Sequence, residues 1–213
     1  MFHVVRRDAL EYLTADALAG SVHCFSTRFG GVSGGMLASL NLGTHRGDSP
    51  ENVRENYEIL GKAVGFLPEQ TVFTRQQHTA IVAPATRADC GTGLLRERED
   101  VCDALVTNEP GVALVCFAAD CTPVLLYDPV ARAVGAAHSG WRGTAQGIAA
   151  RTVEEMQRLY GCKPENIRAA IGPSIGQCCF ETDEDVPDAM RAALGAAADP
   201  YIEQRGAKWH VDL

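Results

Sequence analysis

Three residues of this sequence could together hold a metal ion: His78, Cys121 and His138. Each lies at the edge of an apolar, strand-like run, and they are too far apart in the sequence for a local zinc finger. Such spacing suits a site that the fold assembles from three protein ligands and one open position, which is the usual format of catalytic zinc. Thiolate and imidazole ligands favour zinc or copper over magnesium. On spacing alone, a buried cysteine and two histidines in structural roles would be the simpler interpretation.

The residues that follow His138 add a candidate anion site. The segment S-G-W-R-G opens a helix, so that backbone N–H groups and Arg142 could converge on an anion beside the metal. A tight strand-to-helix turn with a packed tryptophan would explain the same residues. Arg28, just before a glycine-rich turn, is a second candidate anion ligand, or else a solvated surface arginine. Asp120 and Asp103 could transfer a proton during hydrolysis, or could fix the tautomer of a histidine ligand.

The elements that must position these residues are mostly strands. Ser49-Pro50-Glu51 predicts a helix start, and Gly65 predicts its end. The apolar patterns predict further helices over residues 143–160 and 183–194, and strands over 22–27, 71–74, 81–83, 103–106, 112–116, 124–127, 133–137 and 167–171. Because strands outnumber helices and hairpin-length links are mixed with crossovers, we predict an α/β (α+β) fold with mixed β-sheets and packed helices.

Composition excludes several classes of function. The formal net charge is −8 and no block of Lys or Arg interrupts it, so we expect no nucleic-acid partner. No apolar run approaches the roughly 20 residues of a membrane span. The N-terminus has no signal-peptide pattern, and we expect a cytoplasmic protein. Eight cysteines are present, and we expect most of them to be reduced. The sequence says nothing of the oligomeric state.

Seven motifs make the chain resemble a known family. They are S-T-R-F-G-G-V-S, S-L-N-L-G, Q-Q-H, C-D-A-L-V-T, A-D-C-T-P-V-L-L, H-S-G-W-R-G-T and I-G-P-S-I-G, and they occur in family order from Ser26 onwards. The family is that of the YfiH-like, "laccase-domain" proteins, also called purine nucleoside phosphorylase or peptidoglycan-editing-factor-like proteins.

The resemblance implies a fold shared with bacterial cysteine-dependent deamidase toxins. It also implies a metal held by His78, Cys121 and His138, with zinc expected and copper possible at the same site. The implied reactions are phosphorolysis of adenosine, inosine and methylthioadenosine and hydrolytic deamination of adenosine, so the expected partners are a small nucleoside and phosphate. We therefore expect Cys121, His138 and Asp120 to be catalytic. The expected substrate-binding residues are Arg28, Asn41, Gln76, Asp103 and Arg142.

The sequence departs from the family pattern at two places. Thr79 follows the histidine of the Q-x-H motif, where the family usually has glycine. The family continues beyond a W-x-V-D-L segment through another cysteine-containing segment and a Ser-Tyr-Arg-like motif, whereas this sequence stops at Leu213. We accordingly expect a single laccase-like domain over residues 1–213 that is short at its C-terminus.

Two other functions fit the same residues. A metal-free cysteine hydrolase with Cys121 as nucleophile and His138 as base would suit amide hydrolysis of a peptidoglycan precursor. A binding module that senses nucleotides would bind nucleosides without turnover. A multicopper oxidase is disfavoured, because a blue-copper centre alone takes two His and one Cys. The chain has only six His, of which His3, His23 and His210 lie outside any motif.

Overall fold

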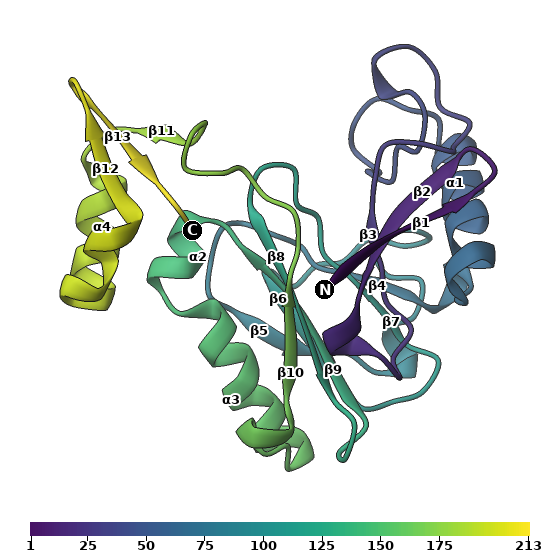
Figure 1. The fold of residues 1–213 in the computed structure, drawn as a ribbon. Helices are drawn as coiled ribbons and strands as arrows, with labels where there is room; N and C mark the ends of the chain where they lie inside the picture. The colour runs from purple at the N-terminus through teal and green to yellow at the C-terminus, as the bar shows by residue number, and fades with distance from the viewer.

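A five-stranded mixed sheet forms the centre of the structure, a computed structural model that describes residues 1–213 (Figure 1). Its strands lie in the order β10-β8-β9-β6-β5, and only β6 and β5 are parallel neighbours. The strands are β5 Val82–Pro84, β6 Ala104–Thr107, β8 Thr122–Asp128, β9 Ala133–Ser139 and β10 Arg168–Ile171. This mixed sheet with packed helices confirms the predicted α/β (α+β) class.

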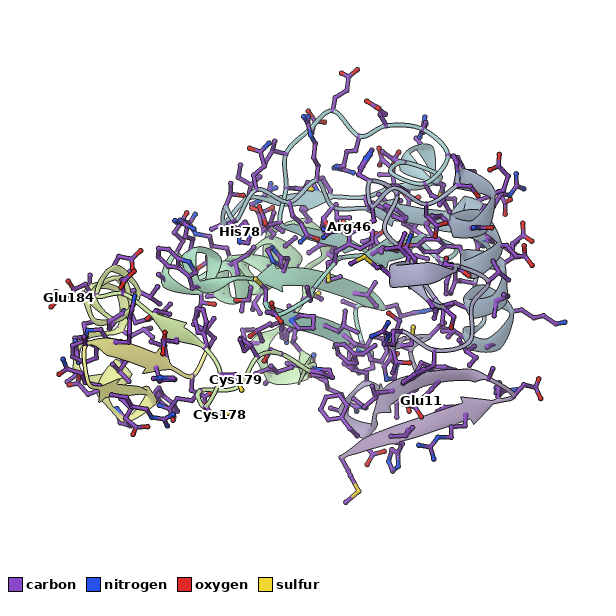
Figure 2. The ribbon with its side chains drawn as sticks, turned by 90° about the horizontal axis from the view of Figure 1, so that it is seen from above. Glu11, Arg46, His78, Cys178, Cys179 and Glu184 are labelled. Atoms are coloured by element: carbon purple, nitrogen blue, oxygen red, sulfur yellow. The ribbon has the colours of Figure 1, made fainter.

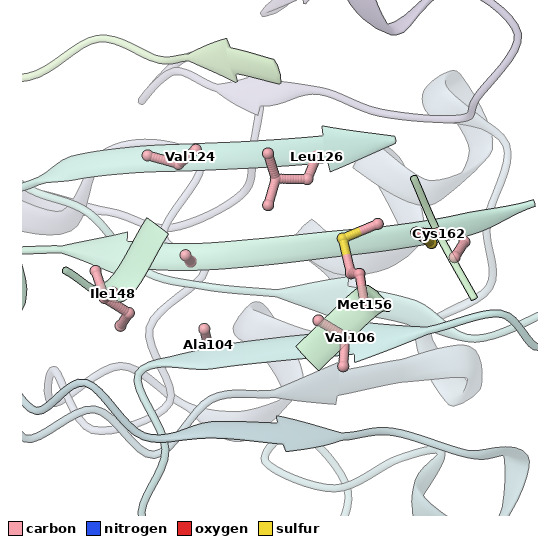
Figure 3. Packing of buried hydrophobic residues seen from close by; sticks show 9 residues of the cluster. Ala104, Val106, Val124, Leu126, Ile148, Met156 and Cys162 are labelled. Carbon is pink, nitrogen blue, oxygen red and sulfur yellow. The ribbon is translucent and has the colours of Figure 1, made fainter. Parts of the chain in front are cut away.

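The main core lies between the central sheet and helix α3, Ile148–Tyr160 (Figure 3). Ile148, Thr152 and Met156 are the fully buried positions of α3, and their spacing of four residues places them on one face. Burying a side chain such as Met156 contributes roughly 1.5–3 kcal/mol. Gly135 of β9 lets this helix approach closely, since a Cβ there would lie 3.1 Å from Thr152 and 3.2 Å from Met156.

A second layer is built from the N-terminal residues. It comprises a three-stranded antiparallel sheet of β1 Phe2–Arg7, β2 Leu10–Ala15 and β3 Phe25–Ser26, with helix α1 Pro50–Val64. The predicted start and end of α1 are confirmed: the Ser49 side chain accepts a hydrogen bond from the Asn52 N–H, and Gly65 stops the helix at φ 109°. The parallel pair β4 Thr71–Phe73 and β7 Ala113–Val115 follows.

The C-terminal residues form a separate small unit on the other side of the molecule (Figure 1). This C-terminal unit consists of β11 Glu181–Thr182, helix α4 Asp185–Leu194, β12 Ile202–Arg205 and β13 Lys208–Val211. It packs on the short helix α2, Trp141–Ala145, because Trp141 contacts the buried cluster that includes Val186 and Met190. No helix of the structure has both the length and the apolar character needed to cross a membrane.

The structure differs from the predicted elements in three ways. The single helix predicted over residues 143–160 is wrong, because Gly147 adopts a left-handed conformation at φ 72° and separates α2 from α3. The strand predicted over residues 22–27 is reduced to Phe25–Ser26. The hairpins β1–β2 and β12–β13 were not predicted at all.

Candidate metal centre

His78, Cys121 and His138 come together as predicted: one ligand atom from each lies within 4.8 Å of the other two. Strands β8 and β9 place two of them, because their antiparallel register pairs Pro123 with His138 and leaves Cys121 at the adjoining strand end. His78 comes from the loop between β4 and β5, and in Figure 2 it lies between the N-terminal sheet and the C-terminal unit. His138 is buried, Cys121 half-buried and His78 exposed, so the site opens at one side.

The carboxylate of Asp103 forms hydrogen bonds with the segments of both histidine ligands. One carboxylate oxygen accepts a hydrogen bond from His138 Nδ1 at 2.9 Å, which leaves Nε2 of that ring free to bind a metal. The two oxygens also accept the backbone N–H groups of Gln77, His78 and Thr79 at 2.9–3.1 Å, and the Thr79 hydroxyl at 2.7 Å. Asp103 has no exposed surface, so it is placed to hold the ligands.

The charge of Asp103 is maintained by these contacts. Burial alone would raise the pKa of Asp103, but the hydrogen bonds from Thr79 and His138 outweigh it and lower the pKa below its ordinary value. An ionised carboxylate hydrogen-bonded to the ring makes the histidine a more basic metal ligand. Thr79, the residue that departs from the family pattern, supplies one of these hydrogen bonds through its hydroxyl.

Gly140 lies against the candidate ligands, and the sequence did not indicate that this position must lack a side chain. A Cβ at this position would lie 2.7 Å from His78 Nδ1 and 3.1 Å from Cys121 Sγ. Its φ of −68° is open to any residue, so the glycine is needed for space and not for backbone freedom. The rings of His78 and His138 meet edge to face beside it, with centroids 4.9 Å apart.

The thiol of Cys121 is protonated when no cation is near. Burial raises the pKa of Cys121, and the charges of Asp120 and Asp103 raise it further. A metal cation reverses this preference, because a coordinating thiol is deprotonated outright. Asp120 is itself exposed, and its carbonyl oxygen accepts the N–H of Ile175 at 2.9 Å.

The donor set fits a borderline-soft divalent ion. It offers one sulfur and two imidazole nitrogens, and the ligand atoms of tetrahedral zinc lie about 3.3–3.8 Å apart. The candidate ligand atoms lie within 4.8 Å of one another, so the side chains need to move inward only a little to bind zinc. Since His78 is exposed, its ring can make most of that movement without disturbing the core.

Arg142 stands at the start of α2, two residues after Gly140. Its guanidinium carbon lies 4.1 Å from the centre of the Trp141 ring, a cation–π contact. It is exposed and forms no ion pair with any carboxylate of the structure. The guanidinium is thus available to an anion.

Gln76 connects the His78 loop to the segment that leads to Cys121. Its amide nitrogen donates to the Phe117 carbonyl at 2.8 Å, and its amide oxygen accepts from the Phe117 N–H at 2.7 Å and from the Thr74 hydroxyl. The side chain expected to bind substrate is engaged in holding two loops together.

Arg28 and Asn41 belong to the long loop between β3 and α1. The guanidinium of Arg28 donates twice to the Ala38 carbonyl, and the Asn41 amide donates to Asp48 at 3.0 Å. Neither side chain forms a hydrogen bond with the three candidate ligands. In the structure both residues brace this loop.

Asp48 is the anchor of the same loop. Hydrogen bonds from the Ser33 hydroxyl, and then from the Asn52 and Asn41 amides, lower the pKa of Asp48 to about 2. These contacts tie the start of α1 to two points of the loop.

A cavity of about 550 Å³ lies next to the site without including its ligands. Most of its lining is apolar, and it includes Ala119 and Pro123, which flank the Cys121 segment. Leu42, Tyr57 and Phe117 line it further from the ligands. The cavity is therefore a neighbour of the candidate metal centre and not the centre itself.

Residues 22–213 match a protein family described as multi-copper polyphenol oxidoreductase laccase. The purine nucleoside phosphorylase of Deinococcus radiodurans is 43% identical over 192 residues, which cover 90% of this chain and 70% of the relative. Purine nucleoside phosphorylase YlmD of Geobacillus stearothermophilus is 39% identical over 202 residues, covering 93% and 74%. The crystal structure of YlmD from that organism matches with a TM-score of 0.89 and 36% identity, over 98% of this chain and 79% of that one.

Proposed function

This chain belongs to the family described as multi-copper polyphenol oxidoreductase laccase, and on that premise we propose that it is a zinc-dependent purine nucleoside phosphorylase that also deaminates adenosine. The relatives named purine nucleoside phosphorylase support the phosphorolytic reaction. The observation that carries the metal dependence is the convergence of His78, Cys121 and His138 on one point.

Although the family description names a multicopper enzyme, the structure does not favour that function for this chain. Over the whole structure, one group of three or more metal-competent side chains is found, and it consists of the same three residues. A multicopper oxidase needs several such groups in one protein.

His78, Cys121 and His138 would hold the zinc, with copper as a second ion that the same donors accept. A bound zinc ion lowers the pKa of a coordinated water towards neutrality and polarises oxygen atoms of the substrate. Asp103 keeps the His138 ring in the orientation that presents Nε2. We propose that Asp120, which is exposed and adjacent to Cys121 in the sequence, carries the proton that moves during deamination.

Phosphorolysis also requires an anion site for phosphate. Arg142 is our candidate for this site, since it lies two residues after Gly140 and its guanidinium has no carboxylate partner. Its planar fork gives paired hydrogen bonds to phosphate oxygens, and the Trp141 ring restricts its position. Arg28 is the second candidate, provided that its contact with Ala38 is exchanged for one with phosphate.

Metal analysis combined with a nucleoside assay tests the proposal. We expect one zinc per chain, and release of hypoxanthine from inosine only when phosphate or arsenate is present. Ammonia release from adenosine should need no phosphate. Hypoxanthine appearing equally fast without phosphate would show a hydrolase, and nucleoside binding with no turnover would show a sensing module.

Cys121→Ser is the decisive variant, and Cys90→Ser is its matched control at a half-buried cysteine outside the site. The first should lose zinc and both activities while its circular dichroism stays that of the wild type, and the second should keep all three. Absence of metal from wild-type protein purified without chelator would instead favour the metal-free Cys–His amide hydrolase.

A further inference from the structure

Cys178 and Cys179 form an exposed pair of thiols away from the candidate metal centre. They are neighbours in the sequence, and their Sγ atoms lie 3.2 Å apart. The other six cysteines are buried or half-buried, and Cys121 is a candidate metal ligand. Figure 2 shows the pair on the segment that leads into the C-terminal unit. No step of the proposed function uses these two thiols.

The pair lies in a turn that is attached to both sides of the molecule. The N–H groups of Cys179 and Phe180 donate to the Gly176 carbonyl at 2.9 and 3.0 Å, which forms the turn. On one side, the Ile175 N–H donates to the Asp120 carbonyl, next to Cys121.

On the other side, Nδ1 of His210 on β13 lies 2.9 Å from the Gln177 carbonyl. The N–H of Glu181, at the start of β11, donates to the Cys179 carbonyl at 3.0 Å. Hydrogen bonds therefore connect the turn at Cys178–Cys179 to the Asp120 carbonyl next to Cys121 and to β11 and β13 of the C-terminal unit.

We propose that Cys178 and Cys179 undergo reversible thiol–disulfide exchange with a low-molecular-weight disulfide, closing a disulfide between adjacent residues that alters the packing of the C-terminal unit. In the first step the Cys178 thiolate attacks one sulfur of the small disulfide and releases one small thiolate. In the second step the Cys179 thiolate attacks Cys178 Sγ, forms the Cys178–Cys179 bond and releases the second small thiol. The protein loses two electrons and two protons, and the small disulfide is reduced to two thiols.

The chemistry of the pair supports this order of attack. A hydrogen bond to Cys178, and then the charge of that thiol, raise the pKa of Cys179. The raised pKa keeps the Cys179 thiol protonated at neutral pH, which suits its assignment as the second thiol to react, and its Sγ lies 3.2 Å from that of Cys178. Both sulfur atoms are accessible to a small disulfide, as thiol–disulfide exchange requires.

Reversibility follows from the covalent geometry. Adjacent Cα atoms across a trans peptide are about 3.8 Å apart, whereas disulfides usually join Cα atoms about 4.4–6.8 Å apart. A bond between neighbours is strained, and strained disulfides are the readily reduced ones that suit a labile role.

The two tryptophans provide a natural probe of the result. The chain has only Trp141 and Trp209, of which the first packs against the C-terminal unit and the second lies within it. Trp141 of α2 packs against its buried cluster, and Trp209 of β13 pairs with Thr182 of β11. With phosphate and nucleoside absent, tryptophan emission therefore reports on the C-terminal unit and on the α2 residues beside it.

The test treats the zinc-loaded full chain with glutathione disulfide, blocks remaining thiols and maps the peptides by mass. We expect the peptide holding the pair to lose two hydrogens without gaining glutathione, and reduced glutathione to restore it. Cys179→Ser should stop at a stable glutathione adduct on Cys178. Cys90→Ser, the matched control, should behave as the wild type.

Tryptophan emission completes the test. It should change on oxidation, return on reduction and stay constant in the Cys178→Ser/Cys179→Ser double variant. Two results overturn the disulfide: both thiols remaining reduced in glutathione disulfide alone, or a glutathione adduct as the final product of the wild type. Unchanged emission in fully oxidised wild type overturns the link to the C-terminal unit.

Discussion

Replacing Gly140 with alanine tests whether empty space at this position sets the metal affinity. The new Cβ would lie 2.7 Å from His78 Nδ1 and 3.1 Å from Cys121 Sγ, well inside normal contact. Because the backbone at φ −68° accepts alanine, the cost arises from these two ligands alone. An inserted methyl group in a packed site costs about 1–3 kcal/mol.

The unfavourable free energy of the added methyl group weakens metal binding more than it destabilises the fold. Without metal, the exposed His78 ring can turn away from the methyl group, so the folded apo-protein loses little stability. With metal, the ring must stay, and the cost of about 1–3 kcal/mol lowers the zinc affinity roughly 5- to 150-fold. Competition with a chromophoric zinc chelator measures this change directly.

Gly34→Ala is the matched control, because nothing lies within 4 Å of its Cβ and its φ is −110°. Its zinc affinity should equal that of the wild type. Equal affinities in the two variants, or a large loss of thermal stability in apo Gly140→Ala, would refute the explanation.

Three further changes probe other parts of the structure. Asp103→Asn should lower zinc affinity roughly 10- to 100-fold, as the loss of a carboxylate behind a histidine ligand does, and equilibrium dialysis would measure it; an unchanged affinity contradicts the orienting role. Arg142→Lys should raise the phosphate concentration for half-maximal phosphorolysis at least tenfold, since charge-assisted hydrogen bonds contribute about 1.5–3 kcal/mol each, while deamination rates stay the same; parallel loss of both activities would mean that Arg142 only braces the turn. Hydrogen bonds from hydroxyl and amide groups lower the pKa of Asp48 to about 2, so its ionised form stabilises the fold above pH ~4 and this contribution is lost as the pH falls towards about 2. The difference in melting temperature between the wild type and Asp48→Asn should therefore be largest above pH 5 and shrink in acid, and a constant difference would rule this out.

Local signals in the sequence predicted the ends of one helix and the three candidate metal ligands. The helix α1 was predicted with its ends because a serine cap, a proline and a final glycine act on their own neighbours. The three candidate ligands were found because each stands at the edge of an apolar run, and the structure brings them together.

Elements without a buried pattern were missed. Five of the six residues of β1 are exposed, so the strand shows no alternation of apolar and polar side chains. Its turn uses Asp8 at φ 55° where glycine would have given a clear signal. Strands β12 and β13 have four residues each, and three of the four residues of β12 are exposed, so this hairpin also lacks a clear alternating pattern.

The supporting contacts of the site could not be predicted from spacing. Asp103 contacts residues 24–26 positions before it and 35 positions after it, and no local pattern encodes such pairs. The side chains that a Cβ at Gly140 would meet come from two other segments of the chain, those of His78 and Cys121. The hydrogen bonds between the Gln76 amide and Phe117 join residues 41 positions apart, so spacing could not indicate them, and substrate binding by Gln76 stays a prediction.

The buried carboxylate of Asp103 has a consequence for the choice of ion. Asp103 fixes the His138 ring and the backbone of the His78 loop. Most of the conformational entropy of the ligands is therefore lost when the chain folds and not when the ion binds. Folding and metallation are then separate events, unlike those of a zinc finger. A prearranged pocket of one sulfur and two nitrogens binds copper more tightly than zinc by the Irving–Williams order. If the site takes up a metal as proposed, the supply of ions would decide which one occupies it, and protein produced in zinc-rich and copper-rich media should carry different metals in the same fold.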